Sequence, residues 1–318
     1  MKIKDVGEFG LIDKIRKKTK LYSKDVIVGI GDDTAVLKFD AKNYLIFTTD
    51  ALAQNVHFSL EYFTQKQIGM KAIEQNVSDI AAMGGLPISA VVSLSLPKNT
   101  DVKIFDGIIN GINKKCKRYK IDFVGGNLSS SKEIIINIAM LGFVEKKYLT
   151  LRSKAKIGDL IFCSGNVGSS SIGLSLLKRN LNGTSIKKHL EPRARLDLAR
   201  KIVKIGISSM IDISDGIASE IRHICRESNV GAIIYADKIP ISNATVIDSK
   251  KINKNPLDFA LYGGEDFELV FTANKNKLRQ LKKHDVKVIG EVVDEKYGIK
   301  LIKNGRKLNF KSGFDHFS

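Results

Sequence analysis

Strand-like and helix-like segments alternate along the chain, and this alternation most limits the folds that the sequence can adopt. Val26 to Phe39 and Tyr44 to Thr49 are rich in Val, Ile and Phe, which is typical of strands. Between Gln65 and Met83 apolar residues recur at helical spacing, and Gly84-Gly85 ends that pattern. Glu133 to Val144 is so continuously apolar that we expect a strand buried inside a sheet covered by helices. The pattern predicts an α/β or α+β fold.

The length of 318 residues is enough for two domains. Lys146 to Lys156 is basic and polar, and Gly158-Asp159 opens a new unit, so a boundary near 145–158 is expected. We therefore predict domains at 1–148 and 149–318. Hydrophobic residues make up 43% of the chain, which is sufficient for a sizeable core in each domain.

The chain carries a net charge of +18, which could attract nucleic acid, acidic lipid or a phosphorylated substrate. Its densest basic runs, at 14–18, 114–118 and 275–287, are typical of the solvent-exposed faces of helices. A nucleic-acid-binding protein would show clustered Lys and Arg with interleaved aromatic residues. Aromatic residues are only 7% of the chain and Trp is absent, so no nucleic-acid partner is expected.

The three cysteines, Cys116, Cys163 and Cys225, form no CxxC pair, and the five histidines form no HxxxH or HExxH pattern. A disulfide framework and a structural zinc site are therefore not expected. The longest apolar stretch, from Ile134 to Val144, is far shorter than the roughly 20 residues of a membrane helix. No apolar leader follows the N-terminus, so we predict a cytoplasmic protein without a membrane partner.

Acidic residues recur at the ends of predicted strands and in turns, in most cases beside glycine. Mg²⁺ prefers oxygen ligands and is usually held by one or two carboxylates together with phosphate oxygens of a substrate. Glycine leaves room for a phosphate, and nearby hydroxyl groups can donate hydrogen bonds to it. The segments are GIGDD (29–33), TTD (48–50), NVSD (76–79), DISDG (212–216) and GGED (263–266).

Each of these segments alone is more often a turn or a helix cap than a ligand site. Five of them together favour a site for Mg²⁺ and a triphosphate. The dipeptide Gly-Lys does not occur in the chain, which excludes the GxxxxGK[ST] loop, and no HRD or DFG triplet occurs. His57 lies in a polar stretch and is either a surface loop residue or a substrate contact. No Ser-His-Asp set with a nucleophile elbow is present.

Taken in order, these segments resemble the motifs of the thiamine-monophosphate kinase family. The resemblance begins at GEFGLI (7–12) and covers nearly the whole chain. The segments that carry it are GIGDDTAV (29–36), TTDALAQNVHF (48–58), NVSDIAAMGG (76–85), MIDISDG (210–216), GGEDFEL (263–269) and GFDHF (313–317).

The resemblance implies a two-domain fold shared with aminoimidazole ribonucleotide synthetase. Residues 1–148 would bind ATP and Mg²⁺ and form a homodimer, and residues 149–318 would complete the active site. The implied reaction transfers the γ-phosphoryl group of ATP to thiamine monophosphate by direct in-line attack, with several Mg²⁺ ions and no catalytic side chain acting as a base. The alternative is another ATP-dependent enzyme of this fold, such as a synthetase of purine biosynthesis.

The resemblance also implies roles for individual residues. Substrate contacts would be made by His57, Glu265 and Phe314, and the aromatic ring of Phe314 suits a cationic thiazolium. The implied ATP contacts are Thr48, Thr49, Gly126, Asn127, Arg152 and Ser214. The implied metal ligands are Asp33, Thr48, Asp50, Asp79, Asn127, Asp212 and Asp215.

One departure from the family pattern concerns a metal ligand. The family has Gly-Gly-Asp-Thr where this chain has Gly125-Gly126-Asn127-Leu128. The Asn127 side chain offers a carbonyl oxygen but no negative charge, so weaker or differently placed metal binding is expected at this position.

Overall fold

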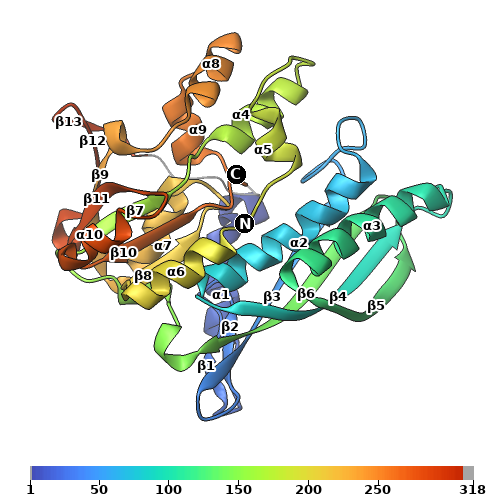
Figure 1. The fold of residues 1–318 in the computed structure, drawn as a ribbon, viewed down its shortest axis with the longest axis horizontal. Coiled ribbons are helices and arrows are strands. Elements are labelled where there is room, and N and C mark those ends of the chain that lie inside the picture. Colours follow the sequence, from blue (N-terminus) through green and yellow to red (C-terminus); the bar gives the residue numbers. More distant parts are fainter. Residues whose placement is uncertain (1, 311–318) are drawn as a thin grey trace.

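Two β-sheets, with helices between and around them, make up the protein. The structure is a computed structural model and describes residues 2–310. Figure 1 shows the first sheet with two long helices over one face, and the second sheet beside it. The expected mixture of strands and helices is confirmed.

Within the described chain, residues 26–145 supply a six-stranded sheet of order β1-β2-β3-β6-β4-β5. Only the β4–β5 pair is parallel. The helices α2 and α3 cover one face of this sheet (Figure 1). The elements of this unit are β1 (Val26–Val28), β2 (Ala35–Lys38), β3 (Asn43–Ala53), α2 (Gln65–Ala82), β4 (Leu86–Leu96), α3 (Val102–Tyr119), β5 (Asp122–Ser130) and β6 (Ile135–Glu145). The helix α1 (Gly7–Lys18) precedes them and contacts the second unit through the ion pairs Arg16–Glu227 and Asp13–Arg226.

A seven-stranded sheet of order β13-β12-β9-β11-β7-β10-β8 follows within the described residues. Its only parallel pair is β9 with β12. The strands are β7 (Leu160–Ser164), β8 (Ser209–Asp212), β9 (Val230–Tyr235), β10 (Leu269–Ala273), β11 (Val286–Asp294), β12 (Ile299–Lys303) and β13 (Arg306–Leu308). The helices are α4 (Ser169–Leu177), α5 (Ile186–Leu190), α6 (Leu196–Ile205), α7 (Ile217–Ser228), α8 (Asn243–Lys251), α9 (Pro256–Tyr262) and α10 (Leu278–Leu281).

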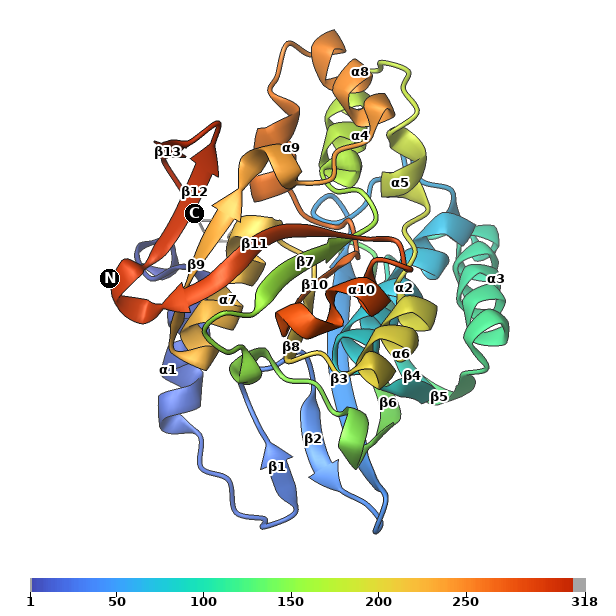
Figure 2. The same ribbon diagram turned by 60° about the vertical axis from the view of Figure 1, so that its left-hand side comes forward.

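Helix α2 lies where the two units meet (Figure 2). It begins at a capping box. The Thr64 side chain accepts a hydrogen bond from the Gln67 backbone N–H, and the Gln67 side chain accepts one from the Thr64 backbone N–H. Its apolar side chains belong to one hydrophobic core with residues of β7, β8, β10 and α6, so the two units share a core. The opposite face of the second sheet packs on α7 and α9 in a separate core.

Three sequence predictions differ from the structure. Residues 26–39 form two short antiparallel strands joined by a turn. In β6, alternate residues such as Ile136, Ile138 and Met140 are buried while their neighbours are partly exposed, so helices cover one face of this strand and not both. Lys115, expected on a solvent-exposed helix face, is buried and paired with Glu74 of α2.

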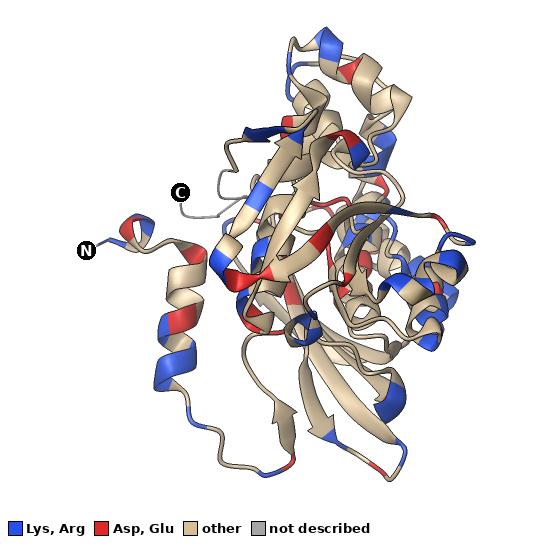
Figure 3. Ribbon diagram, turned by 90° about the vertical axis from the view of Figure 1, so that its left-hand side faces the viewer, with Lys and Arg blue, Asp and Glu red and all other residues tan. Residues whose placement is uncertain are grey.

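The other Lys and Arg residues are spread over elements of both units (Figure 3). Among the described residues, none of the helices combines the length and the apolar character needed to cross a membrane.

The crossing of α2 and α3 depends on two glycines. A Cβ atom on Gly111 would lie 2.1 Å from the Lys66 carbonyl oxygen, and one on Gly69 would lie 2.0 Å from that of Ile108. Neither backbone oxygen can move without separating the helices. This close approach is what buries the apolar faces of both helices.

We predict that Gly111→Ala destabilises the protein by about 1–3 kcal/mol, because the added methyl group forces the two helices apart. Urea unfolding followed by circular dichroism measures the change. Asn113→Ala, at an exposed position of the same helix, serves as the control and should be neutral or slightly stabilising. Equal stability of the Gly111→Ala variant and the unaltered protein would contradict the account of the crossing.

Candidate active site

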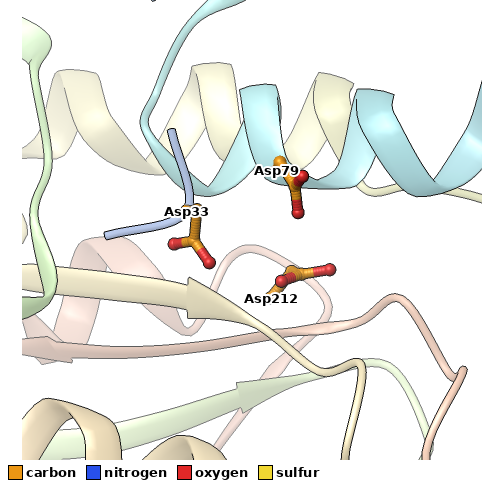
Figure 4. Close-up of side chains that lie close together, drawn as sticks. All are labelled: Asp33, Asp79 and Asp212. Carbon is orange, nitrogen blue, oxygen red and sulfur yellow. The ribbon is translucent and has the colours of Figure 1, made fainter. Parts of the chain in front are cut away.

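Three carboxylates from three distant segments converge beside the C-terminal half of α2 (Figure 4). They belong to Asp33 in the turn between β1 and β2, Asp79 in α2, and Asp212 at the end of β8, and one oxygen of each lies within 4.8 Å of the others. Asp50 of β3 lies close enough that its charge contributes to raising the pKa of Asp79. The structure thus gathers four of the residues that the sequence marked as metal ligands.

The electrostatics of this cluster are unfavourable without a cation. Burial raises the pKa of Asp79 well above its ordinary range, and the charges of Asp50 and Asp212 raise it further. Burial, together with the charge of Asp33, raises the pKa of Asp212 to about 8 and that of Asp50 to about 6. A positive ion among these oxygens would lower all of these pKa values.

Hydroxyl groups hold two of the carboxylates in place. Thr48 Oγ1 donates to Asp79 Oδ2 at 2.6 Å, and Ser78 Oγ donates to Asp212 Oδ2 at 2.5 Å. Thr48 and Asp50 point to the same face of β3 because side chains alternate along a strand. The covering helix α2 brings Asp79 to that face, which is why TTD and NVSD meet.

Arg152 balances the charge of Asp33. It lies in η3 (Arg152–Lys154), and its guanidinium donates a hydrogen bond to Asp33 Oδ1 while its backbone N–H donates to Asp32 Oδ2 at 3.2 Å. Burial lowers the pKa of Arg152, but Asp33 and Asp32 more than offset this, and the net shift is upward. Arg152, which the sequence assigned to ATP, is thus placed next to the carboxylate cluster.

Two expected ligands lie on the opposite face of the first sheet. Thr49 donates to Asn137 Oδ1 at 2.9 Å, and Asn137 stands opposite Ser93, which in turn stands opposite Asn127. Residues opposite each other in a sheet share a face, so Thr49 and Asn127 both point away from α2 and from Asp79. Within one chain, the structure does not bring these two residues to the carboxylate cluster.

Close strand packing explains why position 126, next to Asn127, is a glycine. A Cβ atom there would lie 1.9 Å from the Val92 carbonyl oxygen, so the pairing of β5 with β4 requires a glycine. The glycine therefore does not by itself indicate a bound phosphate.

The segment after β8 adds further acidic groups. The backbone N–H of Asp215 donates to Glu220 Oε1 at 2.9 Å, and Glu220 is buried in α7. Burial raises the pKa of Glu220 well above its ordinary range, and Asp215 and Asp212 raise it further. The sequence analysis did not single out Glu220, because an acidic residue in the first turn of a helix is a common favourable feature.

A cleft of about 1220 Å³ opens beside the carboxylate cluster. Asp50, Asp79 and Asp212 line it together with Ser214 and Asp215. His57 and Glu265 also line it, so both described residues that were expected to contact substrate are found there. The third, Phe314, lies outside the described residues.

Glu265 is held by two basic side chains that the sequence analysis missed. Lys71 Nζ lies 2.5 Å from Glu265 Oε1, and His189 Nδ1 lies 3.4 Å from Glu265 Oε2. Burial alone would raise the pKa of Glu265, but Lys71 and His189 outweigh it, and the net shift is downward. Burial and the nearby Lys71 charge lower the pKa of His189 to about 4, so its imidazole is neutral near pH 7.

Comparison with known proteins defines the class first. The family model described as AIR synthase related protein, N-terminal domain, matches residues 31–144, and the corresponding C-terminal domain matches residues 156–302. A solved structure of hydrogenase maturation protein HypE in complex with ATP covers 87% of this chain and 88% of its own, with a TM-score of 0.72. At 17% identity that likeness concerns the fold alone. The protein is a two-domain member of the AIR synthase related class.

Closer relatives define the particular family. Thiamine-monophosphate kinase of Aquifex aeolicus (strain VF5) is 39% identical over 100% of both chains, and that of Bacillus subtilis (strain 168) is 33% identical over 98% of this chain and 100% of its own. The solved structure of AaThiL complexed with AMPPCP and TMP shares 37% identity over 99% of both chains, with a TM-score of 0.88. The chain belongs to the thiamine-monophosphate kinase family, and the family and fold expected from the sequence are confirmed.

The carboxylate cluster predicts how the metal-free protein responds to pH. The pKa values of Asp212 and Asp32, about 8 and about 7, lie above the ordinary value, so the stability these groups contribute is present at low pH and is lost as the pH rises through them. Between pH 7 and 9, above the range in which histidines titrate, we expect the melting temperature to fall. Asp212→Asn should flatten this decline and stabilise the metal-free protein by about 2 kcal/mol at pH 9.

Thermal unfolding in the presence of a chelator measures this effect. Asp106→Asn, on the exposed side of α3, is the matched control and should leave the pH dependence unchanged. Added Mg²⁺ should raise the melting temperature more at pH 9 than at pH 6. If the melting temperature of Asp212→Asn fell with pH as steeply as that of the unaltered protein, the carboxylate cluster would not be the cause of the decline.

Proposed function

We propose that the protein transfers the γ-phosphoryl group of ATP to thiamine monophosphate, giving thiamine diphosphate and ADP. The observation that carries this proposal is the cleft that joins a buried carboxylate cluster to a second region lined by His57 and Glu265. One region suits a metal–phosphate complex, and the other suits an organic acceptor. Full-length relatives named thiamine-monophosphate kinase support the choice of acceptor.

The donor set fits Mg²⁺. Its atoms are carboxylate oxygens, which this hard cation prefers. Among the described residues, Asp33 Oδ2 is buried and has no hydrogen-bond partner, which is costly unless a cation or another donor occupies the site. We assign metal binding at the carboxylate cluster to Asp33, Thr48, Asp50, Asp79, Asp212 and Asp215. Asn127, on the opposite face of the first sheet, would be a further ligand at a different position. When bound, Mg²⁺ would neutralise charge on both reacting phosphates.

The residues of the chain would act mainly by positioning. The acceptor phosphate is already ionised, so no side chain has to remove a proton from it. Thr48 and Ser78 fix the carboxylate orientations, and Ser214 can donate a hydrogen bond to a phosphate oxygen. Arg152 can exchange its bond to Asp33 for a nucleotide phosphate once a cation compensates that carboxylate. Rigid placement of both anions favours direct in-line transfer.

We further propose that the protein is a homodimer formed through the open face of the first sheet. Phe47, Val91 and Ile135 are apolar residues on that face with exposed fractions of 45%, 42% and 39%. Such a face is typical of a surface that another chain covers. Thr49, Gly126 and Asn127 would then contribute to ATP binding at the interface, with 1–148 as the dimerising domain and 149–318 completing the site.

An assay with ATP, Mg²⁺ and thiamine monophosphate tests the function, with free thiamine as the parallel acceptor and chromatography of the products. Thiamine diphosphate formed from the monophosphate alone supports the proposal. ATP binding without product would favour a synthetase of the same fold or a site weakened at Asn127. Asn127→Asp separates these two outcomes, because it restores activity only in the second.

We predict that Asp79→Asn lowers kcat by about a thousandfold or more. The substitution removes a negative charge that would hold the cation, and that cation would offset the charges of the two phosphates. The substitution keeps the shape of the side chain, so circular dichroism and melting should show an intact fold. Asp106→Asn is the control. Near-normal turnover in Asp79→Asn would contradict the assignment of the carboxylate cluster.

A further inference from the structure

Lys71 is a fully buried lysine on α2, on the turns that precede Asp79. Its ammonium group lies 2.5 Å from Glu265 Oε1 and donates to the His57 carbonyl oxygen at 2.8 Å. It also lies 5.3 Å from the centre of the Phe63 ring. A buried ammonium group is costly unless it is paired and hydrogen-bonded, and these three contacts meet that requirement.

The contacts of Lys71 come from different parts of the fold. His57 and Phe63 belong to the segment between β3 and α2 in the first unit, whereas Glu265 lies between α9 and β10 in the second. Both His57 and Glu265 line the cleft. One buried side chain thus fixes two walls of the cleft relative to each other.

Both the backbone and the side chain of Glu265 are held in place. Glu265 has a φ of 65°, a left-handed conformation that non-glycine residues rarely adopt, and its backbone N–H donates to the Ser214 carbonyl oxygen at 2.8 Å. The charge of Lys71 keeps the carboxylate ionised despite its surroundings. An ionised carboxylate in a fixed position suits a cationic ring or an amino group of the acceptor.

We propose that Lys71 is a positioning residue for the acceptor, acting through Glu265 and the His57 segment. This inference rests on the proposed function, because it assumes that the acceptor lies between those two residues. Loss of Lys71 weakens acceptor binding and leaves ATP binding nearly unchanged. The expected signature is a rise in the KM for thiamine monophosphate without a matching rise in the KM for ATP.

A second buried lysine provides a matched control. Lys115 of α3 is buried and forms an ion pair with Glu74 of α2, the helix that also carries Lys71. Glu74 also accepts hydrogen bonds from the Tyr119 hydroxyl and from the Ala194 backbone N–H, both at 2.7 Å. Neither Lys115 nor Glu74 lines the cleft. Removing Lys115 therefore costs stability of the same kind without touching the acceptor region.

The experiment compares steady-state kinetics and melting of Lys71→Met and Lys115→Met. Both variants should melt at lower temperature. Lys71→Met should raise the KM for thiamine monophosphate about tenfold or more and change the KM for ATP by less than about twofold. Lys115→Met should leave both KM values near those of the unaltered protein. Equal KM values for the acceptor in the two variants would overturn the inference.

A double variant covers the case in which Lys71→Met alone does not fold. Lys71→Met with Glu265→Gln removes both charges of the pair, so no unpaired carboxylate remains. If the two residues act as one unit, this variant and Glu265→Gln alone should raise the acceptor KM by similar factors. A clearly larger factor in the double variant than in Glu265→Gln alone would show that Lys71 does not act through Glu265.

The proposed function and the inference fail in different ways. If the unaltered protein neither phosphorylates nor binds thiamine monophosphate in calorimetry, the proposed function is wrong. If it does both, and Lys71→Met binds thiamine monophosphate as tightly as the unaltered protein, only the inference is wrong. Binding of AMPPCP with Mg²⁺ to each variant confirms that the nucleotide side is intact.

Discussion

The packing of helix α2 on both of its sides is the constraint on which the rest of the structure depends. One side covers the first sheet, and the other packs against β8 and α6 of the second unit. A helix in this position has no solvent-facing side for most of its length, so its polar residues must find partners inside the protein. Four polar residues of α2 have such partners: Lys71, Glu74, Ser78 and Asp79. Three of the partners, Glu265, Ala194 and Asp212, belong to the second unit.

The carboxylate cluster is a consequence of this packing. The repulsion between its negative charges also destabilises the packed arrangement. Asp79 reaches Asp33 and Asp212 only because α2 joins the two sheets, and the same burial makes three neighbouring negative charges costly. Thr48, Ser78 and Arg152 offset part of that cost. They do not supply enough positive charge for all of the carboxylates to be ionised together. A carboxylate cluster whose charges are only partly balanced is therefore built into the interface between the units.

Much of this site could be predicted from the sequence, because Asp33, Asp50, Asp79 and Asp212 each stand at a strand end, a turn or a helix position that forms a recognisable motif. Their convergence in space could not be derived from those motifs one at a time; the ordered resemblance supplied it. The face on which Asn127 lies was not predictable either, whereas the alternation of side chains along a strand already placed Thr49 on the face opposite Thr48 and Asp50. Strand register decides which way a side chain points, and the irregular pairing of β4 with β5 shifts that register by one residue.

Three of the residues that sequence reasoning missed share one physical reason. Lys71, Glu74 and Lys115 stand at helix positions where a polar residue normally indicates a solvent-exposed face. Only the tertiary packing of α2 turns that face inward. His189 and Glu220 lie outside the acidic motifs, and each becomes significant only through a contact with a residue far away in the sequence or across a turn.

Helix α2 also fixes the spacing within the site. Lys71 and Asp79 are eight residues apart on one straight helix, which corresponds to about 12 Å along its axis. Lys71 anchors the region of His57 and Glu265, and Asp79 anchors the carboxylates. The distance between the region of His57 and Glu265 and the carboxylate cluster is therefore set largely by the helix itself. This arrangement makes the separation of the two regions insensitive to small movements of the surrounding loops.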